Sequence, residues 1–303
     1  MTLNADIIVD RKRLKARLNR WRIAAFVLLS FVILILSGKS FFSENETIAR
    51  LNISGIIIND PARNELLKKI QVNDTVKALI VNIDSPGGTF IGGEVLFGRL
   101  RQISKLKPVV SLLGGTATSA AYMTAIGADY IVAHSGTITG SIGVILQSAD
   151  ITELMKKLGI KSQVIKSGRL KGQPSPFEAF SKDAQNATSE VINDFFQAFV
   201  DMISKRRSLD RNKVLTLADG RLFSGRMAKK LGLVDKIGTE KDALNWLQKK
   251  YSLAKSTPII DIIDPNKQNF WEKITNNFFG YTLISERLRL DGVLSLWHPM
   301  INY

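Results

Sequence analysis

Ala78–Ile83 reads ALIVNI and runs directly into Asp84–Gly88, which reads DSPGG. A short, uncharged, largely apolar run of this kind is typical of a strand that is buried on both faces of a sheet. Two adjacent glycines allow backbone conformations that other residues avoid, and they let a second chain segment approach closely. The stretch therefore predicts a buried strand that ends in a tight turn.

Short apolar runs and helical stretches alternate on both sides of this strand, and this alternation indicates an α/β fold with largely parallel pairing. The predicted strands are Ile48–Ile58, Pro108–Leu113, Tyr130–Ala133, Ile142–Gln147 and a strand that ends at Val164–Lys166. The predicted helices are Asn64–Val72, Gly93–Leu106, Ser119–Gly127, Lys182–Arg207, Asp210–Leu217, Gly225–Leu231 and Glu240–Tyr251.

An uncharged apolar run, Ile23–Ser37, follows a basic cluster that lies between Arg11 and Arg22. If Lys39 snorkels to the interface, the apolar length extends to the roughly 20 residues that a bilayer crossing needs. The basic cluster before the run places the N-terminus inside. We therefore predict a retained single-pass anchor. A cleaved signal peptide is the alternative, but no A-x-A cleavage pattern follows the run.

The anchor divides the chain of 303 residues into four parts. Residues 1–20 form a basic cytoplasmic segment, residues 21–42 the transmembrane anchor, and residues 43–265 a globular domain outside the cytoplasm. Residues 266–303 form a C-terminal extension, and their many apolar side chains argue against simple disorder. The sequence gives no role for this extension.

Composition narrows the function classes. The net charge of +15 is compatible with nucleic acid binding. However, the chain has no helix-turn-helix signature, zinc-ligand spacing or basic–aromatic repeat, so we predict no nucleic acid partner and assign the charge to solvated or membrane-facing surface. The absence of cysteine excludes disulfides, thiolate nucleophiles and cysteine-ligated metals. We predict neither a metal site nor a cofactor.

A serine stands at a predicted strand-to-helix junction, in Gly114–Ala121 (GGTATSAA). Ser119 could be an ordinary helix N-cap, which is the commoner role. Alternatively, it could be a nucleophile whose oxyanion is met by the N–H groups of the helix end and of the DSPGG turn. No G-x-S-x-G elbow is present, which argues against an α/β-hydrolase.

A serine nucleophile needs a base. His134 and His298 each stand alone without a motif, so a structural role is the commoner expectation for both. A lysine can act as the base where burial keeps it neutral, and Lys166–Pro176 supplies two candidates. The hydroxyls of Gly136–Val144 could orient such a lysine, or they could simply form a turn.

In order along the chain, five motifs resemble those of the signal peptide peptidase A family, the SppA-type relatives within the ClpP/crotonase superfamily. The match covers roughly Ile48 to Gly238. The motifs are Asp84–Gly88, Thr116–Tyr122, Thr137–Val144, Lys166–Lys171 followed by Ser175–Pro176, and Asp219–Arg221 with Ala228–Asp235.

The resemblance implies roles for individual residues. It places Ser119 at the nucleophile, Lys171 rather than Lys166 at the general base, and Ser141 at the position that contacts this lysine.

The resemblance also implies an oxyanion hole formed by Gly88 and Ala120. The family usually has two glycines after the nucleophile, whereas this chain has Ala120 and Ala121. Alanine keeps the N–H group but disfavours a positive φ, so the resemblance assigns the Ala120 donor less firmly than Gly88.

As a whole, the resemblance implies a spiral of ββα units, a ring-like homo-oligomer and a serine endopeptidase with a Ser–Lys dyad. Its dyad can be completed across a protomer boundary. The implied substrates are cleaved signal peptides or similar hydrophobic peptides, and the implied location is the outer, periplasmic side of a bacterial cytoplasmic membrane.

Three alternatives stay open at this point. A crotonase-type acyl-CoA enzyme conflicts with the predicted anchor and the serine–lysine pair. A non-catalytic scaffold of the same fold conflicts with the presence of both dyad positions. A sister protease with a narrow membrane-protein substrate is compatible with the sequence.

Overall fold

The computed structural model describes residue 15 and residues 17–30, 46–262 and 294–296. The chain divides into two compact units, Met1–Asn45 and Glu46–Tyr303. In the first unit, residues 17–30 form a helix on which apolar side chains such as Trp21 and Phe26 are exposed. Among the described residues, no helix combines the length and the apolar character that crossing a bilayer requires. Residues 31–42 of the predicted anchor lie outside the described residues.

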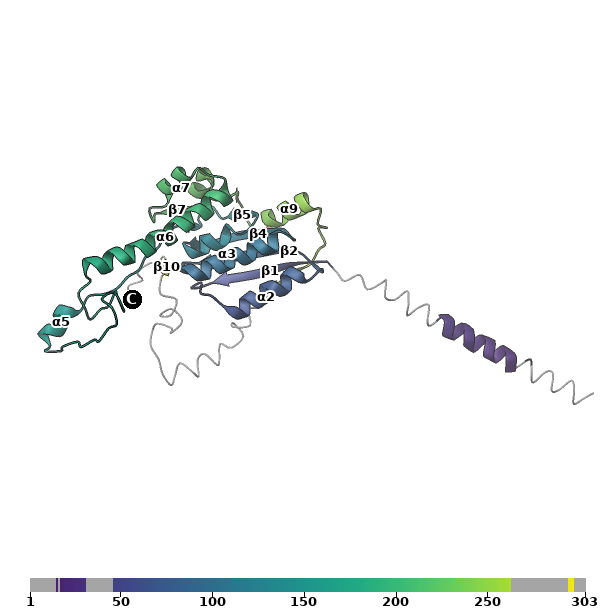
Figure 1. Ribbon diagram of the computed structural model, residues 1–303. Helices are drawn as coiled ribbons and strands as arrows, with labels where there is room; N and C mark the ends of the chain where they lie inside the picture. The colour runs from purple at the N-terminus through teal and green to yellow at the C-terminus, as the bar shows by residue number, and fades with distance from the viewer. Residues whose placement is uncertain (1–14, 16, 31–45, 263–293, 297–303) are drawn as a thin grey trace, which may run out of the picture. The chain divides into compact units, whose positions relative to one another are not determined.

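The second unit alternates strands and helices in chain order, as Figure 1 shows. Its elements are β1 (Thr47–Ser54), α2 (Pro61–Val72), β2 (Val76–Ser85), β3 (Gly87–Thr89), α3 (Phe90–Ser104), β4 (Val109–Thr118), α4 (Ala120–Ala125), β5 (Tyr130–Ala133), β6 (Ile138–Gly140), α5 (Thr152–Lys157), α6 (Lys182–Arg207), α7 (Arg211–Leu217), β7 (Leu222–Ser224), α8 (Gly225–Leu231), β8 (Lys236–Ile237), α9 (Glu240–Tyr251), β9 (Ile259–Ile262) and β10 (Leu294–Leu296).

The main sheet runs in the order β7-β6-β4-β2-β1-β9. Its pairs are parallel except for β6 with β7, which confirms the predicted α/β class. One side of β4 carries two neighbours in succession. Its first half pairs with β5, which in turn pairs with β8, and its last residues, Thr116–Thr118, pair with β6.

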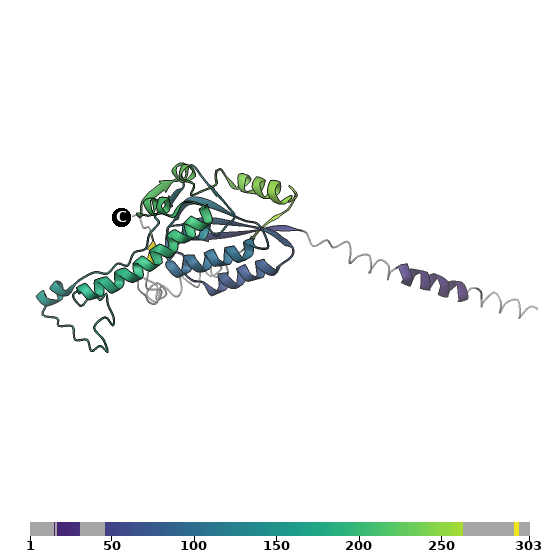
Figure 2. The ribbon, with the colours of Figure 1, turned by 45° about the horizontal axis from the view of Figure 1, so that its top comes forward.

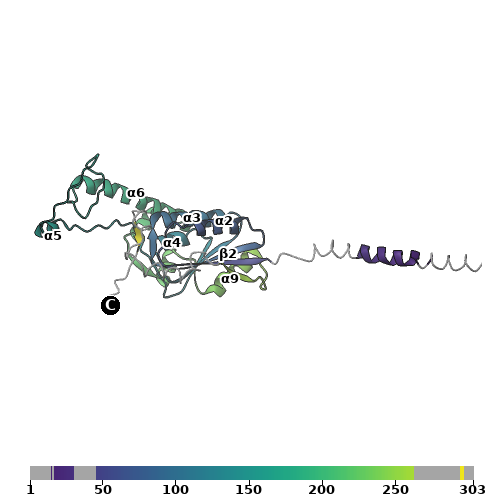
Figure 3. The ribbon, with the colours of Figure 1, turned by 90° about the horizontal axis from the view of Figure 1, so that it is seen from below.

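Two apolar cores cover the two faces of the sheet. The larger core joins one face to helices α2, α3, α4 and α6. The smaller core joins the other face to Ala243 and Leu247 of α9. Figure 3 shows α2, α3 and α4 together on one side of the strands and α9 on the other. Strand side chains alternate between these cores, because successive residues of a strand point to opposite faces.

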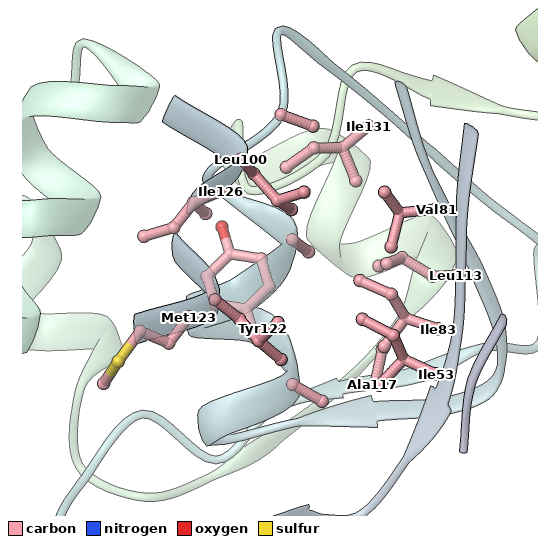
Figure 4. Packing of buried hydrophobic residues seen from close by; sticks show 14 of the residues in the cluster. Ile53, Val81, Ile83, Leu100, Leu113, Ala117, Tyr122, Met123, Ile126 and Ile131 are labelled. Carbon is pink, nitrogen blue, oxygen red and sulfur yellow. The ribbon is translucent and has the colours of Figure 1, made fainter. Parts of the chain in front are cut away.

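A buried tyrosine fixes helix α4, which begins directly after Ser119. Tyr122 lies in the centre of the larger core (Figure 4), and its hydroxyl donates a hydrogen bond of 2.8 Å to the carbonyl of Leu233. Burial raises the pKa of Tyr122 above its usual range, so this hydroxyl stays a donor. Asp235, just beyond, binds Arg207 at 2.7 Å and accepts a hydrogen bond from the Ile131 N–H. The leucine-glycine-leucine-valine-aspartate motif therefore holds α4 in place.

Residues 145–181, with the first half of α6, form an arm that extends away from the sheet in Figures 1 and 2. The two strands predicted within or beside it are wrong, because 164–166 is irregular and Ile142–Gln147 forms no strand. Ser141 has a φ of 47°, which turns the chain out of the sheet directly after β6. Ile142 and Val144 are buried nonetheless, so their apolar character reflects core packing rather than strand pairing.

Candidate active site

Ser119 occupies a strained strand-to-helix turn. It follows the last residue of β4 and precedes the first residue of α4, with φ 56° and ψ −121°. A positive φ is rare for a residue other than glycine, and strained backbone of this kind clusters at functional sites. The Ser119 N–H donates to the Gly140 carbonyl at 2.9 Å, and the Ser119 carbonyl accepts from Met123 at 2.9 Å. Its side chain makes no capping hydrogen bond to the helix, which removes the N-cap interpretation.

Buried hydroxyl groups tie the three turns of the site together. Thr118 donates to the Pro86 carbonyl at 2.9 Å, which joins the end of β4 to the turn after β2. Thr139 donates to the Ala117 carbonyl at 2.6 Å, which joins β6 to β4. Thr137 donates to the Gly114 carbonyl at 2.7 Å. These threonines therefore hold neighbouring segments together through these hydrogen bonds. The sequence alone could not show whether such hydroxyls would orient a lysine or stabilise a turn.

The glycine pair before Ser119 lies inside a strand, although the sequence predicted that the strand would end at Leu113. Gly114 and Gly115 interrupt the pairing of β2 with β4, and the Asp84 carboxylate accepts a hydrogen bond of 2.9 Å from the Thr116 N–H. A Cβ atom on Gly114 would lie 3.1 Å from the Asp84 Cβ atom. β4 then resumes pairing and delivers Ser119 to the carboxyl end of the sheet. Sequence reasoning missed this role of Asp84.

Gly88 lies where two segments meet. The Ile57 N–H donates to Gly87 at 2.8 Å, and Thr89 donates to the Ile57 carbonyl at 2.9 Å. A Cβ atom on Gly88 would stand 1.8 Å from the Ile57 carbonyl oxygen, so only glycine fits. Hydrogen-bonding groups of successive strand residues point to opposite sides, so the Gly88 N–H points away from Ile57.

Strand β10 lies on that other side of Gly88. It pairs antiparallel with β3, and Ser295 stands opposite Gly88. The C-terminal extension, to which the sequence gave no role, therefore contributes a strand at the candidate oxyanion position. An extended peptide that bound beside Gly88 would use the same edge.

Two alanines follow Ser119 without strain. The positive φ falls on Ser119, and neither Ala120 nor Ala121 has one. Both are fully buried, and a Cβ atom on Gly93 of α3 would lie 3.0 Å from the Ala120 Cβ atom. Alanine therefore fits this position. Ala120 is also the first residue of α4, and the backbone N–H groups at the start of a helix have no hydrogen-bond partner within the helix.

Ser141 lies beside the same junction, at the end of β6. Its N–H donates to the Arg221 carbonyl at 2.8 Å. Gly140 before it has a φ of 85°, and a Cβ atom there would come within 2.5 Å of the Phe223 ring. The turn that contains Asp219–Arg221 thus packs against the turn that carries Ser141.

A largely apolar cleft of about 710 Å³ opens next to Ser141. Its walls come from the segment after Ser141, from α6 and from the turn before Arg221, and they include Ile142, Val144, Ile192, Phe196 and Gly220. This volume lies within the range of ligand pockets, roughly 300–1,000 Å³. The cleft can accept an apolar side chain of a peptide bound near Ser119.

The two candidate lysines have different surroundings in the arm. Lys166 is half-buried, and its ammonium group pairs with the Glu178 carboxylate, which also accepts from Gln173 at 2.6 Å. Lys171 is exposed, and within the described part of the chain its side chain makes no hydrogen bond or ion pair. The structure therefore brings Ser119, Gly88, Ala120 and Ser141 together, and it does not bring Lys171 to them within one chain.

In the described part of the chain, neither histidine nor possible metal ligands support a different mechanism at this site. His134 is exposed, and His298 lies outside the described residues. Within the described ranges, no three acidic or histidine side chains gather in a way that could hold a metal ion. The arrangement that remains is a strained serine with backbone N–H groups beside it, which suits nucleophilic attack on a carbonyl.

Comparison with known proteins gives consistent results for this region. The family model described as peptidase family S49 matches residues 101–254. A protein of Methanocaldococcus jannaschii named as a protease is 38% identical over 68% of this chain and 66% of its own. A Synechocystis protein, also named as a protease, is 37% identical over 74% of this chain and 82% of its own.

A third relative, from Enterococcus faecium, is named as a signal peptide peptidase SppA. It is 34% identical over 72% of this chain and 67% of its own. Among solved structures, the 1510-N membrane-bound stomatin-specific protease covers 72% of this chain and 98% of its own, with 15% identity and a TM-score of 0.49.

Proposed function

This chain belongs to peptidase family S49, and we propose on that basis that it is a serine endopeptidase that works through Ser119 and Lys171. The observation that carries the proposal is the buried, strained backbone of Ser119 at the end of β4. A sharp turn from strand to helix presents a serine Oγ atom in unrelated serine hydrolases as well.

The reaction has two steps. The Ser119 Oγ atom attacks the peptide carbonyl while a neutral lysine amine takes its proton, and the same amine then protonates the leaving nitrogen. Water hydrolyses the acyl-enzyme by the reverse use of the lysine. The N–H groups of Gly88 and Ala120 would hold the oxyanion, and Ser141 would orient the amine.

A second copy of the chain is required to complete this dyad. Lys171 lies on the arm, which exposes an unusual number of apolar side chains, and Ile165 is completely exposed. A lysine acts as a base only where burial favours its neutral form. Packing of the arm onto a neighbouring subunit would bury both the apolar side chains and Lys171, and would place the amine beside the partner's serine. The functional enzyme is then a homo-oligomer.

Residues 21–42 would anchor the enzyme in the cytoplasmic membrane, with the catalytic domain outside. Apolar peptides such as cleaved signal peptides are the proposed substrates, because an extended peptide can add a strand to β3 and place an apolar side chain in the cleft beside Ser141. The name of the Enterococcus faecium relative supports this choice.

The test combines covalent labelling with subunit mixing. A peptidyl phosphonate should modify Ser119, identified by mass spectrometry, and Ser119→Ala should not react. Ser119→Ala and Lys171→Ala should each be inactive, and mixing them after subunit exchange should restore cleavage of a fluorogenic apolar peptide. Labelling at another residue would overturn the nucleophile. Mixed subunits that stay inactive despite exchange would overturn the shared dyad.

A further inference from the structure

The amino ends of the parallel strands gather at one end of the sheet, opposite to Ser119. Helices α2, α3 and α9 run back along the sheet, so each of them ends where the next strand begins. α2 and α3 cover one face and α9 covers the other (Figure 3). Their last turns and the loops that follow therefore surround the starts of β2, β4 and β9.

This end of the sheet carries exposed, unpaired positive charge. Its exposed lysines are Lys69, Lys105, Lys249, Lys250 and Lys255. Within the described ranges, none of the five takes part in an ion pair. The acidic side chains nearby are mostly paired with other cations, since Glu46 pairs with Lys77, Asp129 with Arg101, and Asp242, which lines a pocket with Lys249 and Lys250, pairs with Lys236. Asp74 makes no such pair among the described residues. The charge is therefore strongly unbalanced.

Exposed apolar side chains stand among these lysines. Val72, the last residue of α2, is 76% exposed, and Leu106, in the loop after α3, is 66% exposed. The two loops are joined, because the Lys107 ammonium group donates to the carbonyls of Ile70, at 2.8 Å, and Asn73. On the other face of the sheet, Lys250 lies 5.0 Å from the Trp246 ring centre and Tyr251 packs edge-on against that ring.

Helix capping explains only part of this pattern. Lysines near a helix C-terminus interact favourably with the last carbonyl groups, which accounts for Lys69, Lys249 and Lys250. It applies to Lys105 as well, which is the C-cap residue of α3, but it does not account for Lys255, which lies beyond the end of α9. It does not concern Val72 and Leu106, whose exposed side chains would be stabilised if an apolar phase covered them.

The chain itself indicates what covers this face. β1 begins at Thr47 on this same end, since its first residues pair with the start of β2 and with β9. If the proposed anchor ends at residue 42, the intervening residues can extend no more than about 18 Å. The anchor supplies this proximity, so the inference rests on the proposed function to that extent.

We propose that the basic face, defined as Lys69, Val72, Lys105, Leu106, Lys249, Lys250, Tyr251 and Lys255, binds the headgroup region of a bilayer that contains anionic phospholipid. The lysines meet the phosphates, and Val72, Leu106 and Tyr251 enter the boundary between headgroups and acyl chains. The ten residues of β4 separate this face from Ser119 by about 30 Å, so the active site opens away from the lipid.

The experiment uses the full chain in vesicles of equal parts phosphatidylglycerol and phosphatidylcholine. The chain has no cysteine, so Leu106→Cys gives one labelling position on the face and Lys157→Cys, on α5, gives a matched position far from it. A fluorophore at residue 106 should be quenched by headgroup spin-labelled lipid, and one at residue 157 should not. Vesicles of phosphatidylcholine alone should weaken the quenching.

Charge variants test the cause. Replacing Lys69, Lys105, Lys249 and Lys250 by Gln should reduce the quenching, since each lysine near an anionic surface contributes roughly fivefold in binding. The same exchange at Lys157, Lys161, Lys182 and Lys241 should not, although the net charge changes equally. Peptide cleavage by both variants checks that they fold.

Alkaline extraction separates the two proposals. Chain that is extracted from the vesicles refutes the anchor, whereas retained chain with no quenching at residue 106 refutes the lipid face. Equal quenching at residue 106 in vesicles with and without phosphatidylglycerol would also overturn the proposal. Shielding of residue 106 in native membranes but not in vesicles would show that the face meets a protein instead.

Discussion

The two ends of the central sheet differ in how their backbone leaves regular structure. At the amino end, Ser208 and Ser252 have positive φ values, but both take the left-handed conformation that commonly ends a helix. At the carboxyl end, Ser119 combines a φ of 56° with a ψ of −121°, which lies outside that conformation. Positions where close backbone contact leaves room only for glycine, such as Gly88, also lie at this end.

This difference suggests that the carboxyl end of the sheet is shaped by catalysis and the amino end by folding and surface binding. Strain of about 1–3 kcal/mol at a residue persists only where the surroundings hold it, and the threonine hydrogen bonds and close backbone contacts provide that support around Ser119. The amino end has ordinary helix caps and an unpaired basic surface. Substitutions at the carboxyl end should therefore affect turnover, and those at the amino end should affect folding or surface binding alone.

The largest effect is expected at Ser119. Ser119→Ala should lower kcat by at least about a thousandfold, because it removes the nucleophile. Ser119→Gly should be equally inactive but more stable than Ser119→Ala by roughly 1 kcal/mol, since glycine tolerates the positive φ. Peptide hydrolysis and thermal unfolding measure the two quantities. Equal stability of the two variants would show that the turn is not strained.

A similar loss of activity is expected at Lys171 and not at Lys166. Lys171→Ala should reduce kcat by about a thousandfold, as expected for members of one catalytic unit. Lys166→Ala should keep its turnover, because Lys166 pairs with Glu178 and serves the arm. Lys161→Ala, at another exposed position of the arm, is the control. If Lys166→Ala loses activity and Lys171→Ala keeps it, the base is misassigned.

An intermediate effect is expected at Gly88. Gly88→Ala places a Cβ atom against the Ile57 carbonyl, so it should cost about 1–3 kcal/mol of unfolding free energy and also reduce turnover. Gly98→Ala is the matched control, since no atom lies near that position and alanine favours a helix by about 1 kcal/mol. Denaturant unfolding and peptide hydrolysis compare them. Normal stability of Gly88→Ala would contradict the close contact.

The smallest effect is expected at the amino end. Lys107→Met removes two hydrogen bonds to carbonyls at the end of α2 and should cost about 1–2 kcal/mol of unfolding free energy. The activity per folded molecule should not change, because Ser119 lies at the far end of β4. A clear fall in kcat would break the separation between the two ends.

The sequence predicted most elements because their signals are local. Helix α6 was expected at Lys182–Arg207 and occurs there, since apolar residues at helical spacing can be recognised from nearby residues alone. β4 was cut short at Leu113 because a glycine pair normally ends a strand. The Asp84 carboxylate that carries the strand past it comes from a different segment, which local patterns do not reveal.

The residues of the candidate site also fall into those that local motifs reveal and one that depends on distant surfaces. Ser119, Gly88, Ala120 and Ser141 could be named because their motifs are short and ordered along the chain. The proposed general base, Lys171, could not be established from local sequence in this way. Charge and spacing show which lysines are available, but desolvation depends on surfaces that pack against the arm, and one chain does not contain them.

The pairing of β10 with β3 has a consequence for how peptides compete for the site. The free edge of β3 has one set of hydrogen-bonding groups, so a substrate strand and the chain's own end cannot pair with it together. A segment of the same chain competes at an effective concentration that is set by its tether and does not fall when the protein is diluted. A dilute peptide of equal affinity would therefore rarely displace it. A substrate that a second contact holds near β3 would reach a comparable local concentration, so the pairing of β10 with β3 favours such substrates over peptides that diffuse freely.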